Sequence, residues 1–293
     1  MLFRSDTFRL GTLAGIPIGL HWSVAFVAWL FTLGLATRIL PGEAPGAEPA
    51  AYWLAGILAG VLFLVSLLAH ELAHAVVARR SGVRVDGITL WLLGGVARLD
   101  GEAPTPGRDL AIAGAGPLTS ALLGLSFGLA TFALGDAAPV LLVEALAWLA
   151  RINVVLAVFN LLPGAPLDGG RIVRAVAWRL GRNRLRASLL AARFGRWLGL
   201  AMVGFGTLEL VIGADLGGLW TIVLGLFLSG SAAAEGDQEL AREALGGVKV
   251  RSVMATDLER VGGNHTVDVF AGAFLADGRT VAALRSEEHT SEL

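Results

Sequence analysis

The stretch AYWLAGILAGVLFLVSLLAHELAHAVVA, residues 51–78, decides how the rest of the chain is interpreted. Outside His70-Glu71-Leu72-Ala73-His74 it carries no charged side chain, and its other polar side chains are Tyr52 and Ser66. Its length and apolar composition predict a helix that crosses a bilayer. Histidines at i and i+4 share one face of a helix, so both imidazoles can bind one Zn²⁺.

Glu71 stands next to the first of these histidines. The pattern H-E-x-x-H is typical of zinc peptidases, in which the glutamate takes a proton from water at the metal. The alternative is a buried helix whose two histidines are satisfied by hydrogen bonds to their neighbours. An ionisable cluster at membrane depth is costly and by default indicates function. The stretch therefore predicts a zinc peptidase site inside a membrane span.

The composition agrees with a membrane protein. The chain is 55% hydrophobic and 16% charged, and its mean hydropathy is +0.69, which is typical of a protein with several spans in a lipid bilayer. The net charge of −1 gives no reason to expect a nucleic acid as a partner. The absence of cysteine excludes disulfides and thiolate ligands, so a metal needs histidine, carboxylate, amide, carbonyl or water ligands.

Six segments approach or exceed the roughly 17–25 residues that a helix needs to cross a bilayer. They are 19–40, 51–78, 110–134, 139–162, 191–212 and 216–231. Arginines gather in the connections 79–108 and 171–186, whereas the other three connections carry only acidic charge. The positive-inside rule then places both termini in the cytoplasm. We expect a multi-pass protein of the inner (plasma) membrane whose histidines lie in the cytoplasmic half of the second span.

The segment 83–96 is β-branched, partly alternating and interrupted by glycine, and 8–20 has a similar character. Both predict short strands or a hairpin near the metal. The edge of such a sheet can pair with an extended substrate peptide. A hairpin that only packs at the membrane surface explains the pattern equally well.

A catalytic zinc site has three protein ligands and one open position. The segment Asn160-Leu161-Leu162-Pro163-Gly164-Ala165-Pro166-Leu167-Asp168-Gly169-Gly170 offers one candidate for the third ligand. Its prolines and glycines should break the fourth span and present Asp168 on the same side of the membrane as the histidines. Asn160 brings an amide to the same level. The alternative is that Asp168 is the N-cap of a helix that starts near Gly170.

Four segments together resemble the site-2 protease family of intramembrane zinc metalloproteases. They are 15–23, His70 to His74, 113–118 and 160–170, within a resemblance that covers about 8–231. The resemblance implies one Zn²⁺ per chain with His70, His74 and Asp168 as ligands. It implies Glu71 as the catalytic base and Asn160 as the catalytic residue that positions substrate or stabilises the oxyanion. His21, at a strand-to-helix junction, is interpreted as a structural anchor.

The same resemblance implies a zinc metalloendopeptidase that cuts in or near the transmembrane segments of membrane proteins. The substrate it implies is a single-span protein already trimmed by another protease, as in regulated intramembrane proteolysis. Two other classes of function stay open at this point. One is a transporter or channel, although the sequence shows no duplicated halves. The other is an inactive relative that only binds membrane proteins, although Glu71 and Asp168 are both present.

The chain changes character after residue 231. Val250-Arg251-Ser252-Val253-Met254-Ala255-Thr256 resembles the opening of a CBS domain, a module that often binds adenine nucleotides when complete; the alternative is a generic helix–strand tail. Residues 285–293 resemble a translated sequencing adapter. We predict an N-terminal interfacial segment 1–18, a six-span metalloprotease domain 19–233, a truncated CBS-like domain 234–284 and an artefact 285–293.

The expected fold class is therefore an α-helical polytopic membrane protein. It should have about six transmembrane helices with short β-strands near the active site. A partial soluble CBS-like α/β segment should follow them.

Overall fold

The computed structural model describes residues 7–91, 94–101, 103–181, 183–213, 217–249 and 252. The chain divides into two compact units, Met1–Glu243 and Ala244–Leu293. Almost all of the second unit, including the CBS-like segment, lies outside the described residues, so the predicted domain limits there stay predictions. The first unit carries the fold and the site.

Within the described residues, six helical segments are long and apolar enough to cross a membrane, as the sequence predicts. The first is bent: α1 (Ser23–Gly34) continues through a π-helical turn (Leu35–Ile39) into α2 (Leu40–Glu43). The other five are α3 (Pro49–Arg80), α4 (Pro106–Leu134, followed by a short 3₁₀ turn, Gly135–Ala137), α5 (Val140–Asn160), α7 (Arg184–Ile212) and α8 (Gly217–Leu245).

The helix limits differ from the predicted span limits at three places, each for a local reason. The first span starts at Ser23 instead of residue 19, because the residues before it are paired in a strand. The fifth starts at Arg184, where the Asn183 side chain accepts a hydrogen bond from the Arg186 amide at 2.8 Å. The last continues past residue 231 to Leu245, since a charged helical extension follows its apolar part.

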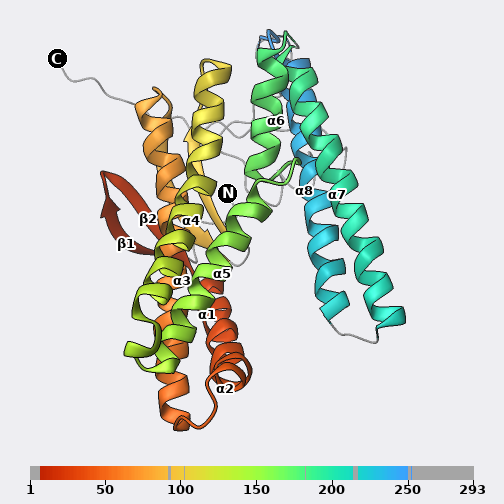
Figure 1. Ribbon diagram of the computed structural model, residues 1–293. Coiled ribbons are helices and arrows are strands. Elements are labelled where there is room, and N and C mark those ends of the chain that lie inside the picture. Colours follow the sequence, from red (N-terminus) through yellow and green to blue (C-terminus); the bar gives the residue numbers. More distant parts are fainter. Residues whose placement is uncertain are drawn as a thin grey trace, which may run out of the picture. The chain divides into compact units, whose positions relative to one another are not determined.

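Helix α3 lies at the centre of the helical packing. It contacts α1, α4, α5 and the small sheet, and Figure 1 shows it running beside α4 and α5. Phe31, Phe63 and Trp148 pack edge to face between α1, α3 and α5, with ring centroids 5.1–6.1 Å apart. Large apolar side chains also cover the outer faces, among them Leu58, which is 55% exposed. Such faces suit contact with lipid.

Four strands form one sheet in the order β1-β2-β3-β4. They are β1 (Thr7–Leu13), β2 (Ile16–His21), β3 (Arg84–Trp91) and β4 (Gly94–Asp100). The pairs β1–β2 and β3–β4 are antiparallel, and β2–β3 is parallel. The strands predicted in 8–20 and 83–96 are thus confirmed. Because β4 contacts α3, the last strand of the sheet lies beside the histidine helix.

The break after the fourth span is also present. Helix α5 ends at Asn160, residues 161–167 form a non-helical connection, and α6 (Asp168–Arg179) follows. The connection is fastened to α7, since the Ala165 amide donates to the Ala191 carbonyl at 3.1 Å. The chain therefore presents Asp168 as the first residue of a short helix.

Candidate metal centre

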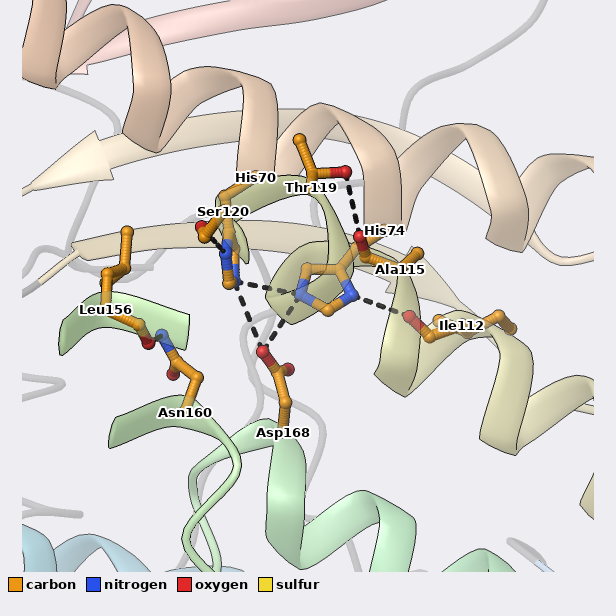
Figure 2. A network of polar contacts seen from close by, with 9 residues as sticks. All are labelled: His70, His74, Ile112, Ala115, Thr119, Ser120, Leu156, Asn160 and Asp168. Atoms are coloured by element: carbon orange, nitrogen blue, oxygen red, sulfur yellow. Dashed lines mark hydrogen bonds and ion pairs between the residues drawn. The ribbon is translucent and has the colours of Figure 1, made fainter. Parts of the chain in front are cut away.

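Both histidines of α3 are oriented by helix α4. Nδ1 of His74 lies 2.7 Å from the carbonyl oxygen of Ile112, and Nδ1 of His70 lies 2.9 Å from the hydroxyl of Ser120. A carbonyl oxygen only accepts hydrogen bonds, so His74 carries its proton on Nδ1 and leaves Nε2 with a free lone pair. Figure 2 shows both rings pointing away from α3 with their Nε2 atoms close together. Such outer contacts fix the ring orientation of metal-binding histidines.

The carboxylate of Asp168 meets the two rings at their Nε2 atoms. Its Oδ2 lies 3.2 Å from Nε2 of His70 and 3.1 Å from Nε2 of His74, and the two Nε2 atoms are 3.2 Å apart. A tetrahedral Zn²⁺ with bonds of about 2.0–2.2 Å sets its ligand atoms about 3.3 Å apart. The three residues therefore form a group that can hold a metal ion, and their donor atoms are those that zinc prefers without cysteine.

Helix α4 leaves room for this group at Gly116. A Cβ atom at that position would overlap Nε2 of both histidines. Only glycine allows the backbone of α4 to pass so close to the ligand atoms. The space beside the three donors is thus part of how the helices pack, which is a second reason why the residues fit a zinc ion.

Asp168 is held as a carboxylate. Burial raises its pKa, but the hydrogen bonds and charges of His70 and His74 outweigh burial and lower the pKa to about 2. The side chain is 13% exposed. The N-cap position of α6 belongs to Leu167, so the interpretation of Asp168 as a helix cap is wrong. Its carboxylate is directed to the histidines instead (Figure 2).

Glu71 lies between the histidines and strand β4. A Cβ on Gly95 would overlap the Glu71 side chain, so the glycine gives the carboxylate its place against the strand. Glu71 is close enough to His70, His74 and Asp168 to interact with their charges, yet it is not among the three converging donors. This position beside the metal group is the one that a proton acceptor needs.

One cavity of about 580 Å³ joins the predicted site residues. His70, Glu71, His74, Asp168 and Asn160 all line it. The side-chain amide of Asn160 donates to the Leu156 carbonyl of its own helix at 3.0 Å (Figure 2). The remaining walls are mainly apolar and include Leu67, Trp91, Leu156, Phe159, Leu224, Phe227 and Leu228. Such a cavity suits an apolar segment with a peptide bond at its polar end.

Sequence reasoning missed the supports that α4 and β4 give to the site. These supports are the hydroxyl of Ser120, the carbonyl of Ile112, and the two glycines Gly116 and Gly95. A polar serine inside an apolar span was a readable signal, because a buried hydroxyl needs a hydrogen-bond partner. The contact of the Ile112 carbonyl with His74 gave no such signal in the sequence, because every residue has a backbone carbonyl. His21 matches its interpretation as an anchor, with Nδ1 2.7 Å from the hydroxyl of Ser23.

Several known proteins with similar sequences are named as zinc metalloproteases. The family model of peptidase family M50 matches residues 58–135 and 128–202. A protein of Mycobacterium tuberculosis named as a zinc metalloprotease, Rip3, is 44% identical over 275 residues, which are 94% of this chain and 70% of that protein. The chain belongs to peptidase family M50. It is therefore a zinc metallopeptidase, and this decides against a transporter or channel.

Two further relatives extend the likeness. A Synechocystis protein also named as a zinc metalloprotease, sll0528, is 34% identical over 246 residues, or 83% of this chain and 63% of that protein. The solved structure of the site-2 protease from Methanocaldococcus jannaschii is 30% identical with a TM-score of 0.52 and covers 78% of this chain and 95% of that one. The site-2 protease fold and the six apolar helices make this M50 peptidase a multi-pass membrane protein.

Proposed function

We propose that this M50 peptidase cuts peptide bonds in or near the transmembrane segments of single-span membrane proteins, as in regulated intramembrane proteolysis. One observation carries the proposal. The group His70, His74 and Asp168 shares a largely apolar cavity with Glu71, and the helices that form this cavity are long enough to cross a bilayer. Apolar walls suit the apolar side chains of a transmembrane segment.

The residues around the metal have separate proposed roles. His70, His74 and Asp168 hold one Zn²⁺, which when bound polarises a carbonyl and makes water more acidic. Glu71 takes a proton from the attacking water and delivers it to the leaving amine. Asn160 orients the substrate or stabilises the negative charge that develops on the carbonyl oxygen. Its place on the wall of the same cavity supports this role.

The substrate enters this scheme as an extended segment. A helical span hides its peptide bonds in its own hydrogen bonds, so it must unwind before it is cut. Strand β4 stands at the end of the sheet order, and its Gly94 and Gly95 line the cavity. An unwound segment that pairs with β4 would lie alongside Glu71, with its side chains against the apolar walls.

The location follows from charge. The arginine-rich connections support a proposed orientation with both termini in the cytoplasm, in an inner (plasma) membrane. The histidines then lie towards the cytoplasmic end of α3. An adenine nucleotide is proposed as a ligand only for a complete CBS domain.

The test is cleavage of a tagged single-span protein by the purified peptidase in detergent. Wild type and Glu48→Gln, an exposed control at the start of α3, should cleave it. Glu71→Gln should bind zinc and leave the substrate intact, and a zinc chelator should stop the wild type. Cleavage by Glu71→Gln at the wild-type rate would refute the base. Binding without cleavage by the zinc-loaded wild type would favour a binding module.

Asn160 is tested in the same assay. Asn160→Ala should slow cleavage about 100-fold while zinc content stays unchanged, as expected when a donor to a developing charge is removed. A wild-type rate in this variant would take Asn160 out of the mechanism.

A further inference from the structure

A buried ion pair joins the helix that supports the histidines to the helix that carries Asp168. Asp109, in the first turn of α4, is 1% exposed. It accepts two hydrogen bonds from Arg174 of α6, from Nε to Oδ2 at 3.0 Å and from Nη2 to Oδ1 at 2.8 Å. Two parallel bonds between a guanidinium and a carboxylate fix the relative orientation of both groups, which a single contact does not.

On both α4 and α6, the ion pair lies within about two helical turns of the metal group. On α4, Asp109 comes one turn before Ile112, whose carbonyl orients His74. On α6, Arg171 follows Asp168 by three residues and Arg174 follows Arg171 by three, so each is a neighbour of the one before it on the helix surface. Nη2 of Arg171 also lies 3.5 Å from Oδ1 of Asp109. The pair thus spans the two supports of the site.

Helix α6 depends on such contacts for its position. It follows the non-helical connection 161–167, and it packs against α4 and α7. The histidine helix α3 also packs against α4. The helix of Asp168 and the helix of the histidines therefore both pack against α4. The position of Asp168 relative to the histidines depends on these two contacts.

Charges from α8 complete the surroundings of Arg174. Glu235 and Glu239 are close enough to interact with its guanidinium, and they line a cavity of about 160 Å³ together with it. The side chain of Arg174 is only 11% exposed. A buried charge that loses its partner is left uncompensated, so the packing of α4 on α6 is sensitive to either member of the pair.

We propose that Asp109 and Arg174 are positioning residues that hold α6 so that the carboxylate of Asp168 meets His70 and His74. The inference rests on the proposed ligand roles of those three residues. A role in stability alone would affect zinc release only when the chain unfolds. The positioning role predicts instead that zinc leaves faster from a chain that is still folded.

The experiment measures zinc release to a chelator from the purified, zinc-loaded full chain in detergent, well below its unfolding temperature. Asp109→Asn and Arg174→Gln should each release zinc about tenfold faster, within the range seen when outer contacts of a metal site are removed. The double variant should be no faster than the faster single one, because both remove the same contact. Arg179→Gln, an exposed arginine on the same helix, should release zinc at the wild-type rate.

Wild-type release from both folded single variants would overturn the proposal. If Asp109→Asn does not fold, Arg174→Lys decides, because lysine keeps the charge and loses the paired hydrogen bonds. Faster release from Arg174→Lys supports the proposal, and a wild-type rate overturns it. Asp168→Ala is measured beside them: a wild-type rate there would refute the ligand set itself, so the two failures are distinguishable.

Discussion

The two halves of the proposed metal centre are built in different ways. His70 and His74 lie one turn apart on a long regular helix, and α4 holds both rings from behind. Asp168 begins a short helix after a break in the chain, and it reaches the histidines through contacts of α6 with α4. The histidine half is therefore set by local helix geometry, whereas the aspartate half is set by packing between distant segments.

Removing a histidine should break the centre most completely. His74→Ala deletes one of the converging donors, and the two that remain cannot form the usual catalytic zinc site. Zinc content and cleavage should both fall to background. His21→Ala, which removes a histidine that contacts Ser23 instead, should keep both. Zinc retention by His74→Ala at one per chain would contradict the ligand assignment.

The second largest loss of zinc binding should come from adding a side chain at Gly116. The new methyl group of Gly116→Ala would overlap Nε2 of both histidines, so α4 must move or the rings must turn. We expect zinc affinity to fall about 100-fold, at the upper end of the losses seen at supporting positions. Gly114→Ala on the same helix is the matched control, since a Cβ there meets no atom within 4 Å. Equal zinc affinities in the two variants would show that the close approach is unimportant.

A smaller loss should follow from removing one support of a ring. Ser120→Ala takes away the partner of Nδ1 of His70, so the ring is less well oriented while all three donors remain. Zinc affinity should fall about tenfold. Ser126→Ala, which removes a hydroxyl bonded only within α4, is expected to match the wild type in a zinc titration. A Ser120→Ala titration that also overlays the wild type would mean that the helix alone orients His70.

The contrast between the halves also explains what the sequence could predict. The spacing of His70 and His74 and the apolar runs are local patterns, so the ligand pair and the six spans were readable. Asp168 was found because prolines and glycines marked a break beside a site that lacked a ligand. The contact of Asp109 with Arg174 joins positions 65 residues apart, and the arginine was interpreted only as a charge that orients the membrane protein. The helix ends depart from the predicted spans where strand pairing or a charged helical extension, and not hydropathy, sets the end of the helix.

The central claim is that both halves meet at one zinc ion, and zinc K-edge X-ray absorption of the purified peptidase tests it most directly. The account predicts one zinc per chain with two imidazole nitrogens and a carboxylate oxygen among its ligands. In Asp168→Ala zinc content should also fall, and a sample loaded with excess zinc should keep the two imidazoles while the carboxylate contribution is lost. A wild-type spectrum with fewer than two imidazoles, or one that Asp168→Ala leaves unchanged, would contradict the account.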